Sequence, residues 1–250
     1  VYGYDNVPVM DGERRARVEY AINPAQAEVV REVFRRYAAG EGLRPIAMAL
    51  NARGVPSPHA GRRGSGSWSP VTIHDMLRNE RFRGVLVWGK AGSAYRKGTR
   101  VAVERPAASW IRVERADLAI VDAELWGAVE ARRRASTARG RGGPRGGTAP
   151  KSLLAGIARC AACGGPMQQD RTRWGAAMTP VYRCAWAHER GAAVCTMRAR
   201  RPTAEVDGAL VEWLQAHALR DEWVDEVMAE ARRQAERKPV DEPDEFERKS

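Results

Sequence analysis

Apolar positions three and four residues apart predict a helix over residues 24–39. Both ends of this segment carry helix signals, because Asn23 is an N-cap residue, Pro24 suits the first helical position and Gly40 stops the helix. Gln26 stands where it can close a capping box with the N-cap. The buried stripe is expected to consist of Val30, Val33, Phe34 and Tyr37. A stripe of this kind is typical of a packed core rather than of a binding site.

Two shorter helical patterns follow, separated by a loop rich in Pro, Gly and Ser. The first lies in "LRPIAMALNARG" and ends at Gly54, and we expect it to bury Ile46, Ala47 and Leu50. The second runs from Ser69, its N-cap, to Arg78, with Pro70 at the first helical position. Its inward residues are Ile73, Met76 and Leu77, and its outer face carries Thr72, His74, Asp75 and Arg78.

This pair of short helices resembles a helix-turn-helix, whose second helix lies in the major groove of DNA. An ordinary helical hairpin remains the alternative, because the connecting loop is far longer than the usual turn.

Apolar, β-branched runs predict strands in "GVLVWGK", "TRVAVER" and "WIRVE", of which the first two are joined by a basic loop, "AGSAYRKG". A helix in "VDAELWGAVEARRRA" then begins at the cap residue Asp122 and buries Leu125, Trp126 and Val129. Residues 1–134 are therefore expected to form one mixed helical and β module.

Residues 135–150 have no apolar side chain larger than alanine, so they lack the means to build a core and are expected to be a linker. Arg139, Arg141 and Arg145 are spaced by glycines in this segment. Two interpretations stay open: an arm that follows the minor groove, or a hinge that binds nothing.

All cysteines of the chain, Cys160, Cys163, Cys184 and Cys195, lie within a short stretch after this linker. The first pair forms a turn that points two thiolates at one centre, and a tetrahedral zinc ion accepts four such ligands. Metal binding would also supply folding energy to a module too small to bury much apolar surface. We therefore expect a zinc ribbon over residues 151–202, with one structural Zn²⁺ per chain.

Other interpretations of the cysteines are weaker. A redox pair would leave the second pair unexplained, and disulfides require an exported protein, for which the sequence shows no signal peptide. The second pair has an unusually wide spacing, so His188 is an alternative fourth ligand to Cys195. Between the pairs, "QQDRTRWGAAMTPVYR" is expected to form a hairpin.

The formal net charge of +11 and the pI near 10.1 favour a polyanionic partner. Acidic residues outnumber basic ones in residues 221–250, so the remainder is more basic still. The planar guanidinium of arginine suits phosphates and guanine edges. The alternative to a polyanionic partner is a basic surface that serves only solubility. The candidate DNA-binding residues are Arg62, Arg63, Ser67, Ser69, Thr72, His74, Arg78, Arg96, Lys97, Arg139, Arg141, Arg145, Gln168, Gln169, Arg171, Thr172, Arg173, Arg183, Arg198 and Arg200.

Residues 203–250 are expected to form a helical extension. Val206, Leu210, Trp213, Trp223, Val227 and Ala231 recur at helical spacing. They could begin a coiled coil or pack back onto the ribbon, since fewer than three good heptads precede Pro239.

In order and spacing, these segments resemble the DNA-binding half of the large serine recombinases. "INPAQAEVVREVFRRYAAGEGLRPIAMALNARGVPSP", "WSPVTIHDMLRNERFRGVLVWG" and the cysteine array are similar to that family's recombinase domain followed by its zinc ribbon. The resemblance implies an α+β fold of two modules joined by the linker, which bind one half of a DNA attachment site for site-specific recombination.

The resemblance further implies that the recombinase domain binds the inner part of the site, the linker follows the minor groove and the ribbon reads the outer major groove. A coiled-coil arm would grow from the ribbon, and the full-length protein would self-associate as a dimer on a site and a tetramer in synapsis. The family's catalytic domain has no counterpart here, so the chain is expected to be a piece of a longer polypeptide, and no serine in it is assigned as nucleophile.

The competing class is a stand-alone zinc-ribbon regulator or protein-interaction adaptor. An enzyme within this chain is the weakest interpretation, because no paired carboxylates, no nucleophile with a base and no open metal site are visible. The sequence has no apolar run long enough for a membrane span, so we expect a cytoplasmic protein associated with the nucleoid and not with a membrane.

Overall fold

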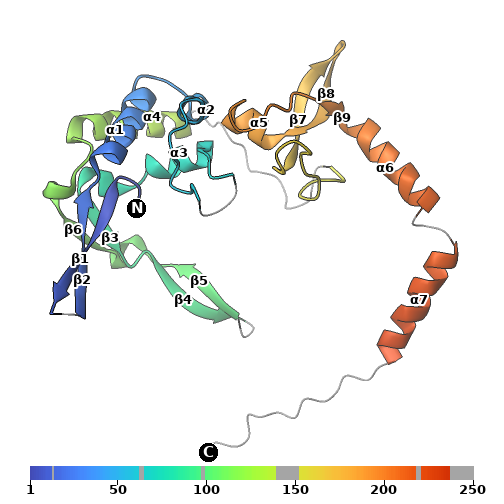
Figure 1. Ribbon diagram of the computed structural model, residues 1–250, viewed down its shortest axis with the longest axis horizontal. Coiled ribbons are helices and arrows are strands. Elements are labelled where there is room, and N and C mark those ends of the chain that lie inside the picture. Colours follow the sequence, from blue (N-terminus) through green and yellow to red (C-terminus); the bar gives the residue numbers. More distant parts are fainter. Residues whose placement is uncertain (13, 62–64, 97–98, 139–151, 218–220, 237–250) are drawn as a thin grey trace, which may run out of the picture. The chain divides into compact units, whose positions relative to one another are not determined.

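The computed structural model describes residues 1–250 except 13, 62–64, 97–98, 139–151, 218–220 and 237–250 (Figure 1). Helices and small antiparallel sheets alternate along the described chain, which confirms the α+β class expected from the sequence. The chain divides into two compact units: residues 1–149, 156–168 and 183–199 form the first, and residues 150–155, 169–182 and 200–250 form the second. The domain boundaries expected from the sequence stay a prediction.

The chain opens with a hairpin that the sequence patterns did not predict. Strand β1 (Tyr4–Asp11) pairs with β2 (Arg14–Ile22), in a register that shifts between Val9 and Met10. Most side chains of both strands are exposed, so neither strand has the apolar and polar alternation that marks a half-buried strand. Tyr4, at the base of the hairpin, is buried in the core.

Helix α1 (Pro24–Ala38) has the start and the buried stripe expected from the sequence. Asn23 Oδ1 accepts a hydrogen bond from the Gln26 amide at 3.1 Å, so the N-cap is confirmed. The prediction that Gln26 closes a capping box is wrong, because Gln26 Oε1 accepts a hydrogen bond from the Gly3 amide at 2.8 Å instead. A side chain expected to serve its own helix thus anchors the hairpin that precedes it.

The connection between α2 (Leu43–Ala52) and α3 (Pro70–Met76) is fixed by a buried tryptophan. Trp68 has no exposed surface, and its ring Nε1 donates to the Val55 carbonyl at 2.9 Å. The Asn51 side chain accepts from the Trp68 amide at 2.8 Å and donates to the Trp68 carbonyl at 3.0 Å. Helix α3 therefore starts from a rigid point, although it ends at Met76, before the expected Arg78.

The other strands described in this module form two separate antiparallel pairs. Strand β3 (Val85–Trp88) pairs with β6 (Ile111–Glu114), whereas β4 (Ala91–Arg96) pairs with β5 (Thr99–Glu104). The segment expected to be a basic loop is therefore largely strand β4. Figure 1 shows the β4–β5 hairpin reaching away from the helices of its unit.

The apolar core of the recombinase-like module lies between α1, α2, α3 and α4 (Ala123–Ala138), and the short 3-10 helices η1 (Glu80–Arg83) and η3 (Ala116–Leu118) each add a buried side chain to it. The 3-10 helix η2 (Ala107–Ser109) has no buried residue. Its largest fully buried side chains include Trp68, Phe34 and Phe82. The Tyr4 hydroxyl lies 2.9 Å from the Arg81 carbonyl oxygen and 2.8 Å from that of Leu118. Burial raises the pKa of Tyr4 to about 12.

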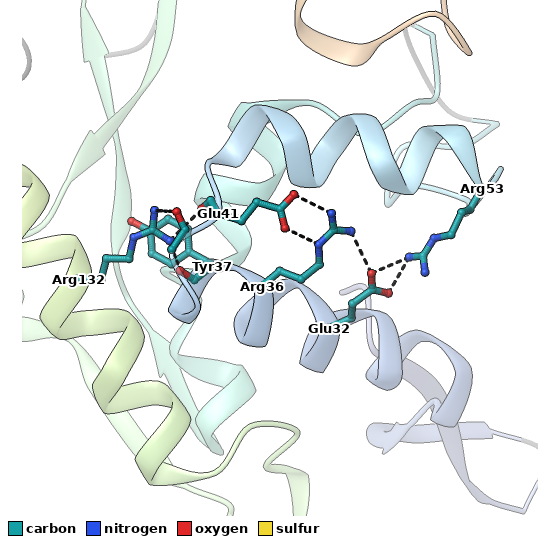
Figure 2. A network of polar contacts seen from close by, with 7 residues as sticks. Glu32, Arg36, Tyr37, Glu41, Arg53 and Arg132 are labelled. Atoms are coloured by element: carbon teal, nitrogen blue, oxygen red, sulfur yellow. Dashed lines mark hydrogen bonds and ion pairs between the residues drawn. The ribbon is translucent and has the colours of Figure 1, made fainter.

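Helix α4 is fastened to the C-terminal end of α1 by one arginine (Figure 2). The Arg132 guanidinium donates to the carbonyls of Tyr37, Gly40 (2.7 Å) and Glu41 (2.8 Å), and its Cζ lies 4.2 Å from the centre of the Tyr37 ring. The Tyr37 carbonyl also accepts from the Gly40 amide at 3.1 Å, and the Gly40 and Glu41 carbonyls lie just after the helix. Arg132 therefore adds charge-assisted hydrogen bonds at the point where the chain leaves α1.

The same network continues through side chains that connect α1 with the end of α2 (Figure 2). Arg36 pairs with Glu41 at 2.6 Å and with Glu32 at 3.1 Å. Arg53, just after α2, pairs with Glu32 at 2.6 Å. These pairs fix the angle between the first two helices of the module.

The ribbon consists of β7 (Met167–Trp174), β8 (Ala177–Cys184) and β9 (Arg201–Pro202), in the order β7-β8-β9, with helix α5 (Ala185–Arg190) directly after β8. The hairpin expected between the cysteine pairs is therefore confirmed. Helices α6 (Thr203–His217) and α7 (Asp221–Glu236) form the extension. Tyr182 of β8 donates to Asp207 Oδ1 at 2.7 Å, which ties the first turns of α6 to the ribbon.

The extension does not bury its expected apolar stripe fully. Val206 and Leu210 are half-buried, but Trp213 and Val227 are 55% and 43% exposed. Within the described residues, no helix combines the length and the apolar character needed to cross a lipid bilayer.

Candidate metal centre and nucleic-acid interface

The cysteine cluster is built by two turns that the strands bring together. Cys160 and Cys163 lie in the turn before β7, where the Gly164 amide donates to the Cys160 carbonyl and the Cys160 amide donates to that of Gly165, both at 2.8 Å. Gly164 has a φ of +70°, a backbone conformation that favours glycine. Cys184 ends β8 and so lies at the same end of the ribbon.

The four sulfur atoms lie in the arrangement of a single tetrahedral site. All Sγ atoms are within 4.8 Å of one another. The Cys160–Cys195, Cys163–Cys184 and Cys184–Cys195 Sγ distances are 3.9, 3.6 and 3.8 Å. Four sulfurs bound tetrahedrally to Zn²⁺ at about 2.3 Å would be separated by about 3.8 Å. The donor set and its spacing therefore fit a zinc ion.

Backbone amides point at three of these sulfurs. The Gly165 amide donates to Cys163 Sγ, that of Ala187 to Cys184 Sγ and that of Met197 to Cys195 Sγ, each at 3.4 Å. Such hydrogen bonds orient the sulfurs and stabilise negative charge on them. The backbone is thus arranged for thiolates rather than for neutral thiols.

Burial opposes ionisation at this cluster. It raises the pKa of Cys163 and Cys184. At Cys160 burial acts in the same direction, but hydrogen bonds from the backbone N–H groups of Ala162 and Cys163 and from the Cys163 and Cys184 thiols together outweigh it and lower the pKa to about 7. Four thiolates this close together, three of them buried, require a cation to neutralise them.

His188, the alternative ligand, is not part of the cysteine group. Its Nδ1 lies 3.2 Å from Gln168 Nε2, in a contact between α5 and β7. Of the described His, Cys, Asp and Glu residues, those that gather closely enough to hold a metal ion are the four cysteines.

The candidate residues at α3 fall into two groups. Ser69 Oγ accepts from the Thr72 amide at 3.1 Å and lies 2.9 Å from Thr72 Oγ1, so both hydroxyls serve the helix start. Ser67 Oγ lies 2.6 Å from Ser65 Oγ. His74 and Arg78 are exposed, with His74 Nδ1 3.1 Å from an oxygen of the neighbouring Asp75. His74 on α3 and Arg78 just after its end are thus more exposed than Thr72.

The candidate residues of the ribbon include some that hydrogen-bond within the ribbon and some that are exposed. Gln168 contacts His188, and Gln169 Nε2 donates to Thr203 Oγ1 at 3.3 Å, so both amides take part in holding the ribbon together. Arg200 donates to Thr172 Oγ1 at 3.1 Å. Of the basic candidates, Arg183 is half-buried, and Arg171, Arg173, Arg198 and Arg200 are exposed.

Several candidates lie outside the described residues: Arg62, Arg63, Lys97, Arg139, Arg141 and Arg145. Arg96 is the last residue of β4. The proposed roles of these residues rest on the sequence.

Family models match most of the chain. The model of the Recombinase domain matches residues 24–136, and that of the Recombinase zinc beta ribbon domain matches residues 153–215. The chain therefore belongs to the recombinases that carry these two domains. The resemblance noted in the sequence is thereby confirmed.

Two solved structures are similar to this chain. One, described as the crystal structure of an LSR-DNA complex, shares 13% sequence identity at a TM-score of 0.34, over 94% of this chain and 65% of its own. The other, from a study of the sequence requirements of the Listeria innocua prophage attP site, shares 14% at a TM-score of 0.33, over 86% and 77%. The recombinase chain thus spans about two thirds of the first structure's chain. No curated protein sequence matches it.

Sequence reasoning missed two features of this recombinase. Trp186 packs so closely on Gly165 that the glycine is required beside the cysteine cluster. Lys90 and Trp110 line a polar pocket of the recombinase domain together with residues from the end of α3, from η1 and from α4. The double glycine after Cys163 hinted at the first feature, whereas the second depends on tertiary contacts.

Proposed function

We propose that this chain binds one half of a DNA attachment site, as the DNA-binding part of a serine recombinase that carries out site-specific recombination. The observation that carries the proposal is the pairing, in one strongly basic chain, of a recombinase domain with a four-cysteine ribbon. A basic excess of this kind favours duplex DNA because each cation set against a phosphate releases a condensed counterion.

Within this function, α3 would lie in the major groove at the inner part of the half-site. Its rigid start at Trp68 and its Ser69 cap support this role, because a reading helix must hold its outer side chains in fixed positions. His74 and Arg78 are the exposed candidates for contact with DNA.

The ribbon would read the outer major groove, with its exposed arginines set against phosphates and base edges. One Zn²⁺ would be held by the four cysteines and would stabilise the ribbon as a structural ion. The sequence predicts a linker over residues 135–150, but residues 135–138 belong to α4. Residues 139–150 would follow the minor groove between the modules, and α6 and α7 would begin a coiled-coil arm. The full-length protein would act as a dimer on each site and a tetramer in synapsis.

The test is a binding titration on DNA taken from the ends of the element that encodes the chain. We expect specific half-site binding at least 10³ times tighter than binding to scrambled DNA, in the range typical of specific DNA-binding proteins. Affinity should fall steeply with salt. Equal affinity for both duplexes would overturn the proposal and leave the ribbon as a protein-interaction module.

A further inference from the structure

A polar pocket of about 650 Å³ opens in the recombinase domain beside the end of α3. Its wall is formed by residues far apart in sequence: Arg78 follows α3, Arg83 ends η1, Lys90 precedes β4, and Trp110 and Trp126 come from the approach to β6 and from α4. The tertiary fold therefore creates this site, and the sequence patterns gave no sign of it.

Positive charge dominates this pocket, because its two half-buried glutamates are already neutralised by arginines. Glu80 pairs with Arg83 at 2.9 Å and lies 3.8 Å from Arg112. Glu130 pairs with Arg133 and lies 3.9 Å from Arg134. These pairs hold the guanidinium groups in place around the opening.

Arg78 and Lys90 take no part in these ion pairs. Both are exposed, and no carboxylate of the described residues lies within ion-pair distance of either side chain. The remaining acidic residue of the wall, Asp75, is 72% exposed and contacts His74. Two cationic side chains at one pocket thus keep their donors for a ligand.

Indole rings hold two of the pocket's cations, Lys90 and Arg83. Lys90 Nζ lies 5.1 Å from the centre of the Trp110 ring, and Arg83 Cζ lies 5.5 Å from that of Trp126. Trp110 Nε1 donates to the Arg105 carbonyl at 2.9 Å. Trp126 stacks on the core residue Phe34 at 5.8 Å. Cation–π contacts with rings that are themselves held reduce the entropy lost when the cations bind an anion.

We propose that this pocket binds one backbone phosphate of the DNA half-site, with Lys90 and Arg78 as the donors that contact it. The inference rests on the proposed function and adds a site to it. A helix in the major groove is flanked by the phosphates of both strands, and contacts to these phosphates set its register. The pocket adjoins the end of α3, so a phosphate bound there would fix how deeply the helix enters the groove.

The test is a double-mutant cycle between Lys90→Gln and single phosphates of the half-site replaced by neutral methylphosphonates. At one phosphate, neutralisation should weaken wild-type binding roughly fivefold but leave Lys90→Gln binding nearly unchanged. Lys90→Gln should also lower the slope of log affinity against log salt by about 0.9, without changing base preference.

Arg17→Gln is the matched control, because it removes one exposed positive charge in β2, outside the pocket. Its effect should add to that of every methylphosphonate. If the effects of Lys90→Gln and of the methylphosphonate add at every phosphate, while specific binding is intact, the assignment of the pocket is wrong but the proposed function stands. If the wild-type chain shows no preference for the half-site over scrambled DNA, both the proposed function and the assignment of the pocket are wrong.

A second arm distinguishes DNA from a small anion. Inorganic phosphate and a mononucleotide are titrated without DNA while tryptophan fluorescence is followed in wild type and in Trp110→Leu. We expect no saturable response below millimolar concentration. A micromolar response that disappears in Trp110→Leu would assign the pocket to a free anion and overturn the DNA assignment.

Discussion

The ring of Trp186 lies so close to the backbone of Gly165 that a Cβ built on Gly165 would be 2.5 Å from Trp186 Cδ2. Gly165 donates its amide to Cys163 Sγ, and Trp186 belongs to α5, which begins directly after Cys184. This contact therefore brings the two cysteine-bearing turns together, and it requires a residue without a side chain.

Gly165→Ala should destabilise the ribbon by about 1 to 3 kcal/mol, because the ring atoms nearest to the new methyl group belong to a rigid indole. Thermal unfolding and metal analysis of the purified chain would measure the effect. Gly208→Ala is the control: nothing lies within 4 Å of a Cβ at this helical position, so it should raise stability by up to about 1 kcal/mol. Equal melting temperatures for the two variants would contradict the prediction.

One zinc ion per chain is expected in the wild type, and Cys184→Ser should lose it, because three thiolates leave the site incomplete. His188→Ala should keep it, since His188 contacts Gln168 and lies outside the cysteine group. Metal analysis after dialysis gives the stoichiometry. Zinc loss in His188→Ala with retention in Cys195→Ser would show that the histidine is the ligand.

Stability should fall in alkaline solution because of Tyr4. The folded-state pKa of Tyr4 is raised from 10.0 to about 12, so its contribution is fully present below pH 10 and is lost as the pH rises through 12. The loss amounts to roughly 2 kcal/mol. Tyr4→Phe should be less stable than wild type at pH 8, and the difference should shrink towards pH 12. Denaturant unfolding across this range provides the measurement, and a constant difference would be evidence against the prediction.

Arg132→Ala should destabilise the recombinase domain by about 2 to 3 kcal/mol, because carbonyls at the end of α1 lose charge-assisted hydrogen bonds. Arg132→Lys should recover only part of this, since an ammonium lacks the planar fork that reaches several carbonyls. Arg134→Ala, whose side chain is 84% exposed, should change stability by less than about 0.5 kcal/mol. Urea unfolding of the three variants would test the ranking, which an unaffected Arg132→Ala protein would refute.

Residues 139–150 should convert two weak DNA encounters into one strong one, because tethering raises the effective concentration of the second module to about the millimolar range. An equimolar mixture of residues 1–138 and 151–250 should bind the half-site far more weakly than the intact chain. Serine at Arg139, Arg141 and Arg145 should lower the salt slope by up to about 0.9 per lost phosphate contact. Equal affinity of mixture and intact chain would disprove joint binding, and an unchanged slope would make the segment only a tether.

Local signals in the sequence determined the helices and the metal centre. The N-cap of α1, the start of α3 at Ser69 and the hairpin between the cysteine pairs each depend on neighbouring residues, so a local pattern was enough to predict them. The zinc site could be predicted because four cysteines form a ligand set that suits zinc and lie in a module too small to bury a large core. Their order with the recombinase segments then identified the family.

Tertiary structure decided the features that depend on residues far apart in the chain. Gln26 bonds to Gly3 rather than to its own helix, β3 pairs with β6 across the β4–β5 hairpin, and Lys90 reaches the same pocket as Arg78. The exposed strands β1 and β4 lack the burial that produces a hydrophobic alternation, so their pairing left no pattern in the sequence. Local propensity cannot specify such contacts, because their free energy comes from partners that only the folded chain brings together.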